Sequence, residues 1–377
     1  EGLWNLFLPG LRPEDPGTRL CNLDYAPLAE SMGRLPWASE VFNCSAPDTG
    51  NMEVLHLFAT DQQRAQWLLP LLHGDMRSAF AMSEPDVASS DPTNLQTTVR
   101  REGDALVVSG RKWFITGAAH PHCRLLIVMC RNAEVDAEDA SDAHRRHSMV
   151  LVPLDTPGVQ VLRNIPVLHH HAPEGHCEIL LQNVRVPQTS LLGAWGAGFA
   201  MAQARLGPGR VHHCMRTIGQ CELALQLAAE RTLERQMFGR YESEFSNVQD
   251  WLAESRIEID QARLLVLHTA WLLDQGEAVD IATTRAQVAA IKVVAARLQS
   301  RVVDRAMQVF GAMGLSPDTP LAQFWSWGRA LHLMDGPDEV HLRSVARHEI
   351  AQARGRMGTS AAWFTTPEQM QATPRIR

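Results

Sequence analysis

The spacing of apolar residues changes twice along this chain of 377 residues, and these changes constrain its fold more than any other feature. Before Ser78 and after Gly198 the spacing is helical, and from Ile281 to Phe310 apolar residues recur every three or four positions. Between these parts lie short runs rich in Val, Ile and aromatic residues, separated by glycine and polar turns. We predict an α+β fold of three domains: an N-terminal helical domain at residues 1–78, expected to be incomplete, an antiparallel β domain at 79–190 and a C-terminal four-helix bundle at 191–377.

Charge and cysteine content exclude several classes of protein. The formal net charge is −7, whereas binding to nucleic acid or to an anionic membrane requires a basic surface. The seven cysteines form no Cys-x-x-Cys pair, which indicates reduced thiols and no zinc framework. No apolar run reaches the roughly 18 to 20 residues of a membrane span. We therefore expect neither a nucleic-acid partner nor a membrane-spanning segment.

Two further patterns suggest ligands without matching a known kind of site. Gly193, Gly196 and Gly198 follow a predicted strand but lack the G-x-G-x-x-G spacing and a βαβ unit, so they are interpreted as a joint between domains. Three consecutive histidines cannot all face one ion, so the histidines are interpreted as a polar loop next to a pocket, with no metal. The histidines are His169, His170, His171 and His176, with His212 and His213 later in the chain.

Two stretches of the β region suit a flat polar ligand. The segment from Ala81 to Asp91 gathers hydroxyl groups and backbone N–H groups around a proline, although a Ser/Pro surface turn is an equal alternative. Strand alternation places Phe114 and Thr116 on one face, where an aromatic plane and a hydroxyl suit a heteroaromatic cofactor. Ordinary core packing is the alternative there. The hydroxyl residues of the first stretch are Ser83, Ser89 and Ser90.

The C-terminal part contains an acidic residue next to a predicted turn and helix. Residues 308–315 predict a helix that ends in a glycine-broken loop, and Asp335 stands just before another predicted helix, whose apolar residues run from Val340 to Ile350. Taken alone, this pattern favours an ordinary helix–loop–helix in which Asp335 is a solvated turn residue. A glycine hinge beside a carboxylate also suits an active site.

Together these stretches resemble the acyl-CoA dehydrogenase family of flavoproteins over nearly the whole chain. The details of Glu84–Asp91, Leu206–Arg210 and Asp335–His341 resemble most the branch that animals fuse to a phosphotransferase-like kinase domain, which is absent from this sequence. The matching motifs are, in order, Met82-Ser-Glu-Pro85, Lys112-Trp-Phe-Ile-Thr116, Leu233-Glu-Arg-Gln-Met-Phe-Gly239, Gln308-Val-Phe-Gly-Ala-Met-Gly314 and Asp335-Gly336.

The resemblance implies FAD bound between the β domain and the bundle. Because three of the matching positions reach the FAD of a neighbouring subunit in the family, it also implies a homodimer or homotetramer. The implied FAD contacts are Met82, Ser83, Ser89, Phe114, Thr116 and Gly311, together with Arg235, Phe238 and Gln308, which match the positions that reach a neighbour's FAD.

The implied reaction is α,β-dehydrogenation of a fatty acyl-CoA in fatty acid β-oxidation, with electrons passed to an electron-transfer flavoprotein. Asp335 matches the family's glutamate base and is expected to remove the α-proton, with its pKa raised by an apolar acyl pocket. Its backbone N–H is expected to bind the thioester oxygen. By the same comparison Arg210 steadies the loop that carries the base, and Ser90 lies near the CoA chain.

The sequence departs from the family in four places. Aspartate is one methylene shorter than the usual glutamate, Gly209 stands where some relatives place their base, and Pro337 replaces a common threonine. The segment around Ser89 and Ser90 is one residue longer than usual, so these two serines can exchange roles. The alternatives are a flavin oxidase, acting on acyl-CoA or a small carbon acid and releasing hydrogen peroxide, and an inactive acyl-CoA-binding partner. The expected compartment is the cytoplasm of a bacterium, or the mitochondrial or peroxisomal matrix of a eukaryote.

Overall fold

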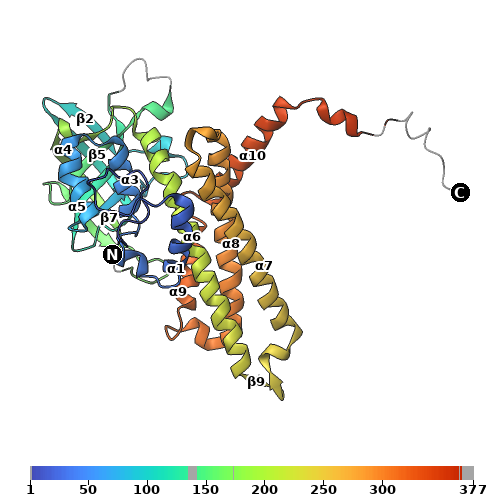
Figure 1. Ribbon diagram of the computed structural model, residues 1–377. Coiled ribbons are helices and arrows are strands. Elements are labelled where there is room, and N and C mark those ends of the chain that lie inside the picture. Colours follow the sequence, from blue (N-terminus) through green and yellow to red (C-terminus); the bar gives the residue numbers. More distant parts are fainter. Residues whose placement is uncertain (1, 135–141, 173, 365, 367–377) are drawn as a thin grey trace.

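The computed structural model describes residues 2–134, 142–172, 174–364 and 366. It places a sheet beside a set of short N-terminal helices, with a bundle of long helices extending away from both (Figure 1). The N-terminal helices are α1 (Asn22–Gly33), α2 (Ala38–Val41), α3 (Asp48–Phe58), α4 (Asp61–Gln63) and α5 (Leu69–His73), with a π-helical turn at Arg64–Leu68.

The short helix α4 begins with the capping box expected from the sequence. The backbone N–H of Gln63 donates to the Thr60 hydroxyl at 3.2 Å, and the Thr60 N–H donates to the Gln63 side-chain oxygen at 3.0 Å. Downstream, Leu68, Leu71 and Leu72 are fully buried, as predicted for one face of a packed helix.

The middle of the chain forms an eight-stranded sheet in the order β6-β7-β3-β2-β4-β5-β8, with β1 paired to β4. The predicted antiparallel arrangement is correct for most pairs but wrong for β4, which pairs in parallel with both β1 and β2. The sheet is therefore mixed. Its strands are β1 (Arg77–Ala81), β2 (Thr98–Glu102), β3 (Ala105–Thr116), β4 (Cys123–Asn132), β5 (His147–Pro153), β6 (Val159–Asn164), β7 (His176–Pro187) and β8 (Leu191–Leu192).

Long strands replace some of the shorter predicted ones. The runs at 105–109 and 112–116 belong to the single strand β3, which continues through an irregularity in its pairing at Gly110. Glycine is needed there because a Cβ atom would lie 2.6 Å from the Thr97 backbone. The runs at 177–181 and 184–187 likewise join in β7. The predicted loop at 133–147 falls partly outside the described residues.

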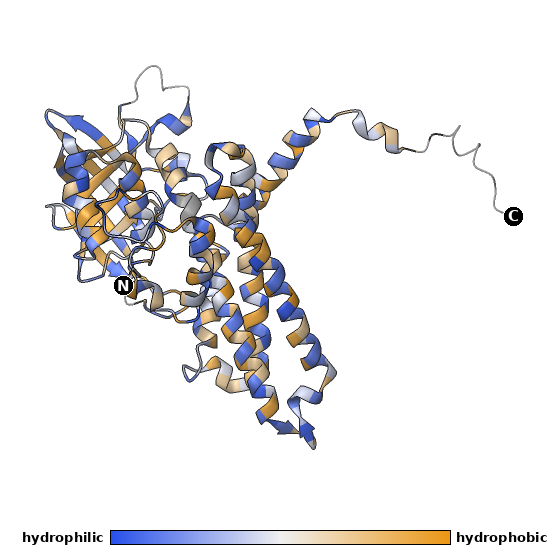
Figure 2. Ribbon diagram, in the orientation of Figure 1, coloured by the Kyte–Doolittle hydropathy of each residue, from blue (hydrophilic) through white to orange (hydrophobic). Residues whose placement is uncertain are grey.

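The two faces of the sheet contribute to different cores. In β4, Leu125, Ile127 and Met129 join the core shared with the helices, while the alternate residues Leu126 and Val128 join the core on the other face. The strands are accordingly rich in hydrophobic residues, whereas the long helices mix hydrophobic and hydrophilic ones (Figure 2). The helical part thus rests on one face of the sheet.

The C-terminal part is built on three long helices, and α8 begins and ends where the sequence predicts. Helices α9 and α10 pack on α8, and α10 then runs outward from the body (Figure 1). No described helix is both long and apolar enough to cross a bilayer. The elements are α6 (Gly198–Glu234), the hairpin β9 (Gln236–Met237) and β10 (Arg240–Tyr241), α7 (Ser246–Asp274), α8 (Ile281–Phe310), α9 (Leu321–Leu331) and α10 (Asp338–Gly355).

Helices α1 and α6 cross with their backbones in contact. A Cβ atom at Gly33 would lie 2.1 Å from the Arg216 carbonyl oxygen, and one at Gly219 would lie 1.9 Å from the Glu30 carbonyl oxygen. Only glycine fits at both positions, and this close crossing joins the N-terminal helices to the bundle.

A buried ion pair anchors the turn that follows β1. Lys112 is fully buried in β3, and its Nζ donates to Glu84 Oε1 at 2.8 Å and to the Met82 carbonyl oxygen at 2.9 Å. The Glu84 carboxylate also accepts the backbone N–H groups of Gln96 and Thr97, at 2.7 and 2.9 Å. The segment after β1 is therefore fixed to β3.

We predict that Lys112→Met destabilises the protein by about 3–5 kcal/mol, because it leaves the Glu84 carboxylate buried without its cation. Urea denaturation of the single variant and of the double variant Lys112→Met/Glu84→Gln measures this effect. The double variant should recover part of the loss, and a double variant no more stable than Lys112→Met would contradict this account.

Candidate functional site

The loop between α9 and α10 carries Asp335 on a strained stretch of backbone. Asp335 has φ 52° and Gly336 has φ 102°. A Cβ atom at Gly336 would lie 2.9 Å from His341 Nε2, so this position requires glycine for space as well as for conformation. The chain thus makes a sharp turn that presents Asp335 toward α6.

Two side chains hold the backbone oxygen of Asp335. Arg210 Nε, from α6, donates to it at 2.9 Å, and His341 Nε2, from α10, donates to it at 3.1 Å. Burial, Arg210 and Lys292 lower the pKa of His341 to about 4, so its ring is neutral and carries its proton on Nε2. The structure therefore brings together the predicted pair Arg210 and Asp335.

A second set of contacts fixes the base of the same loop. His332, just after α9, lies 2.6 Å from Asp338 Oδ2 through Nδ1 and 2.9 Å from Ser300 Oγ through Nε2. The Asp338 N–H also donates to the His332 carbonyl oxygen at 3.2 Å. Helices α8, α9 and α10 are thereby connected at the two ends of the loop.

The carboxylate of Asp335 faces several positive groups. Burial acts to raise its pKa, but nearby charges outweigh burial and hold the pKa below the ordinary value. The expectation of a raised pKa is therefore wrong, because the surroundings of the acid are cationic and not only apolar. The permanently charged groups are Arg205, Arg210 and Lys292. The nearest neighbour is His213, whose Nε2 lies 3.3 Å from Asp335 Oδ2 and whose own pKa is lowered to about 4 by burial and Arg216, so it is charged only at low pH.

Arg205 belongs to no motif that would select it in the sequence, yet it joins all three parts of the protein. Its Nε donates to Asn51 Oδ1 at 2.9 Å, and its guanidinium carbon lies 4.0 Å from the centre of the Phe80 ring. Asn51 belongs to α3 and Phe80 to β1, whereas Arg205 belongs to α6. Glu53, two residues further along α3, has its pKa raised to about 8 by burial, against the opposing charge of Arg205. A polar, charged region therefore continues from Asp335 to the N-terminal helices.

Lys292 is the second residue that sequence reasoning missed. It is fully buried in α8, and its Nζ donates to the Leu331 carbonyl oxygen at the end of α9. The sequence pattern that could have identified Lys292 is a single cation between apolar residues, Ile291 and Val293, both of which are buried in the structure.

The predicted flavin segments lie next to each other. The Trp113 N–H donates to the Ser83 carbonyl oxygen at 3.0 Å, which joins the segment after β1 to β3. Phe114 has φ 50° and is 44% exposed, and Thr116 Oγ1 lies 2.9 Å from His176 Nδ1. Strand alternation is interrupted here by a register shift, so Lys112 and Ile115, three residues apart, are both buried.

The two serines of the longer loop differ in their surroundings. Ser89 Oγ accepts the Glu84 N–H at 3.4 Å, whereas Ser90 is exposed. Met82 is half-buried and packs against the helical core. An exposed ring with hydroxyl and backbone groups around it fits the edge and face of an isoalloxazine.

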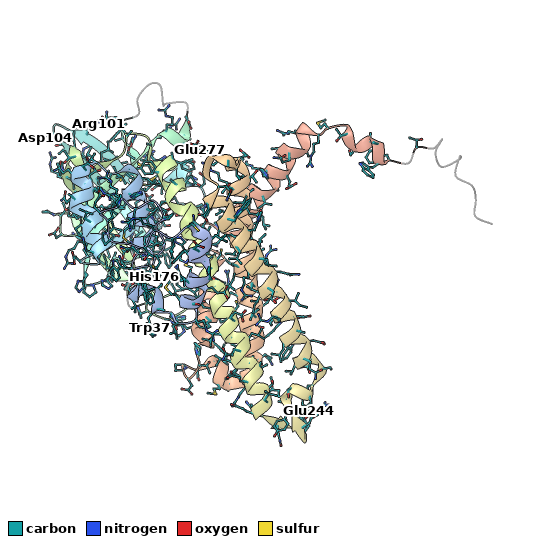
Figure 3. All side chains as sticks on the ribbon, viewed as in Figure 1. Trp37, Arg101, Asp104, His176, Glu244 and Glu277 are labelled. Carbon is teal, nitrogen blue, oxygen red and sulfur yellow. The ribbon has the colours of Figure 1, made fainter. Side chains whose placement is uncertain are left out.

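The structure separates the other predicted flavin residues from these. Arg235 and Phe238 lie at the hairpin after α6, where Phe238 is 93% exposed with φ 50°. Figure 3 shows Glu244, just after that hairpin, at the tip of the bundle, well away from His176 in the sheet. Gln308 and Gly311 lie at the same end of the bundle, since the Arg231 guanidinium stands 5.6 Å from the Phe310 ring.

The histidines do not form a metal site within the part of the chain that the structure describes. His212 and His213 are adjacent on α6 but have different surroundings. His212 packs edge-on against Phe7 and Tyr25, with ring centres 5.9 and 5.1 Å away, whereas His213 faces Asp335.

Comparisons with known proteins agree with this arrangement. Residues 79–184 match the model for the acyl-CoA dehydrogenase middle domain, and residues 196–350 match that for the acyl-CoA dehydrogenase C-terminal domain. A "probable acyl-CoA dehydrogenase FadE2" of Mycobacterium tuberculosis is 54% identical over 94% of this chain and 84% of its own length. Human "acyl-CoA dehydrogenase family member 11" is 45% identical over 95% of this chain, which spans 44% of that longer protein.

A solved structure has the same fold. It is described as a putative acyl-CoA dehydrogenase from Mycobacterium abscessus, with a TM-score of 0.88 and 50% identity over 93% of this chain and 84% of that one. The predicted family and fold are therefore confirmed, and the relatives agree with the predicted branch. The chain belongs to the acyl-CoA dehydrogenase family, whose members are flavoprotein oxidoreductases.

Proposed function

We propose that this protein is an FAD-dependent dehydrogenase that introduces an α,β double bond into a fatty acyl-CoA thioester, with Asp335 as the base. The observation that carries the proposal is the position of Asp335. Its backbone oxygen is held by Arg210 and His341, and its carboxylate is kept ionised by the surrounding cations. A carboxylate held in one place and free of a proton at neutral pH is suited to remove a proton from carbon.

The residues for the cofactor come from the end of β1, the following loop and the end of β3. Met82, Ser83 and Ser89 would border the isoalloxazine on one side, and Phe114 and Thr116 on the other. The Trp113–Ser83 bond supports this grouping because it joins the two segments. When bound, FAD supplies the acceptor for the hydride that leaves the β-carbon.

The chain's own residues perform the proton transfer and the charge stabilisation. Asp335 takes the α-proton, and its backbone N–H donates to the thioester oxygen, where negative charge develops. Arg210 and His341 orient that peptide by holding the adjoining carbonyl oxygen. Ser90, which is exposed beside the cofactor segment, would contact the CoA chain.

The remaining cofactor contacts would come from a neighbouring subunit. Arg235, Phe238 and Gln308 are exposed at the end of the bundle remote from the sheet. A guanidinium there suits the FAD pyrophosphate, which it can bind through two parallel hydrogen bonds. The active form would then be a homodimer or homotetramer, with Gly311 at the same end of the bundle.

The electron acceptor separates the dehydrogenase from the oxidase alternative. We propose that the reduced protein passes its electrons to an electron-transfer flavoprotein. Mixing acyl-CoA-reduced protein with that acceptor or with oxygen distinguishes the two, because rapid release of hydrogen peroxide would make the protein an oxidase. A purified chain that cannot take up FAD would instead be an acyl-CoA-binding partner.

We predict that Asp335→Asn slows reduction of the flavin by acyl-CoA at least about 10²- to 10⁴-fold, because the amide keeps the shape and removes the base. Anaerobic stopped-flow bleaching of the flavin absorbance measures the rate. FAD content should not change.

Glu339→Gln is the matched control. Glu339 is an exposed acid in the first turn of α10, four residues after Asp335, and should not affect the bleaching rate. If Asp335→Asn retains the rate and Glu339→Gln loses it, Glu339 and not Asp335 is the base.

We predict that chains defective at different parts of the flavin site complement each other. One variant carries Phe114→Ala and Thr116→Ala, and the other carries Arg235→Gln and Phe238→Ala. Each alone should purify without FAD. Mixed oligomers, isolated through two different tags after co-expression, should hold FAD in about half of their sites, because one site in each pair is intact.

The absorbance ratio of flavin to protein gives the occupancy. If all four residues act within one chain, every site in the mixed oligomer is defective and no FAD is recovered. Retention of FAD by the Arg235→Gln/Phe238→Ala variant alone would also contradict the shared site.

A further inference from the structure

His213 lies between the proposed base and a second cation. Its Nε2 is 3.3 Å from Asp335 Oδ2, and its Nδ1 is 3.2 Å from Arg216 Nη2. The His213 side chain is 11% exposed. Arg216 is itself held by the Cys44 carbonyl oxygen, to which its Nη1 donates a hydrogen bond at 3.4 Å. These contacts form a chain that runs from the N-terminal helices to Asp335.

The neighbours of His213 fix the position of its proton. A guanidinium has donors only, so His213 Nδ1 must accept the hydrogen bond and cannot carry the proton. Burial and the charge of Arg216 lower the pKa of His213 to about 4, so the ring is neutral near pH 7. The single proton is therefore on Nε2, the nitrogen that faces the carboxylate.

We propose that His213 is a positioning residue for the reaction: its neutral Nε2–H holds the Asp335 carboxylate in its ionised form and in one orientation, and Arg216 sets the tautomer that makes this possible. The inference rests on the proposed function, in which Asp335 is the base. The 3.3 Å separation is an ion-pair contact in which the ring N–H is not aligned on the carboxylate as a hydrogen bond requires. Catalytic hydrogen bonds are often poorly aligned before substrate binds and tighten in the complex.

The other polar and charged groups near Asp335 have different roles. Arg210 and His341 bind its backbone oxygen, whereas Arg205 and Lys292 act on it by charge. These charges lower the pKa of Asp335 whether or not His213 is present. What His213 adds is an N–H within 3.3 Å of the carboxylate oxygen itself. A hydrogen bond from that N–H would favour the charged form and restrict its rotation.

The first test is the pH dependence of flavin reduction by a saturating straight-chain acyl-CoA. The wild-type rate should not fall with decreasing pH until below about pH 5, because Asp335 remains ionised. In His213→Leu the donor is lost and the pKa of Asp335 rises, so the acidic limb should move upward by about one pH unit. His213→Gln, whose amide can donate from a similar position, should restore most of the wild-type profile.

His212→Phe is the matched control, because it removes the adjacent buried histidine from the aromatic cluster with Phe7 and Tyr25. Its acidic limb should coincide with that of the wild type. Coinciding limbs in wild type and His213→Leu would overturn the inference while leaving Asp335 as the base. A full rate in Asp335→Asn would instead remove the proposed function on which it rests.

The second test needs no catalysis. In protein labelled with ¹⁵N-histidine, NMR should show His213 neutral with its proton on Nε2 between pH 5 and 8. In Arg216→Met the pKa of His213 should rise, because one of the charges that lower it is removed, although burial still holds it below its ordinary value. A wild-type ring that carries its proton on Nδ1, or that already titrates near pH 6, would refute the proposal, even if His213→Leu failed to fold.

Discussion

The arrangement of this protein depends on one buried cation. The Arg205 guanidinium leaves α6, donates to Asn51 in α3 and lies against the Phe80 ring in β1. Burial of a guanidinium is costly unless its donors are satisfied and its charge is balanced. Those conditions are met only when the bundle, the N-terminal helices and the sheet are together. The same charge acts on Asp335, so assembly of the three parts also sets the electrostatics of the site.

The acid at position 335 shows how charge and burial compete. Burial favours the protonated form, and a raised pKa would make a stronger base that is less often ionised. The cations around this site reverse that balance. The resulting carboxylate has a lower pKa and is therefore a weaker base, but it is ionised at neutral pH and can accept a proton at once. Its reactivity must then come from orientation and from stabilisation of the product charge.

The sequence was sufficient for features that depend on local pattern. The apolar spacing predicted α8 with its observed bounds, and the Thr60–Gln63 cap followed from four consecutive residues. The parallel pairs of β4 were not predictable in this way, because strand order depends on contacts between distant segments. The bulge near Phe114 likewise depends on the partner strand β7.

The residues of the candidate site also fall into two groups, those that the sequence identified and those that only the structure revealed. Asp335 and Arg210 were identified through motifs, and the structure brings them together. Arg205 and Lys292 carry no motif, since their significance comes from neighbours far away in the chain. His213 was grouped with the other histidines, which were interpreted as a polar loop next to a pocket and not as metal ligands, whereas the structure places it in the helix α6. Its actual neighbours, Asp335 and Arg216, come from a distant loop and from the next turn of its own helix.

The fixed loop has a consequence for how this site can change over evolutionary time. Arg210 and His341 both hold the Asp335 carbonyl oxygen, and His341 leaves no room for a Cβ atom at Gly336, so the backbone of this loop is restrained against adjusting to the length of the acid. Replacing aspartate by glutamate would advance the carboxylate by roughly 1.5 Å, one carbon–carbon bond, into space that the proposed thioester substrate must share. The choice between the two acids is thus tied to where the substrate lies, and exchanging one for the other requires a compensating change among the residues that face the acid.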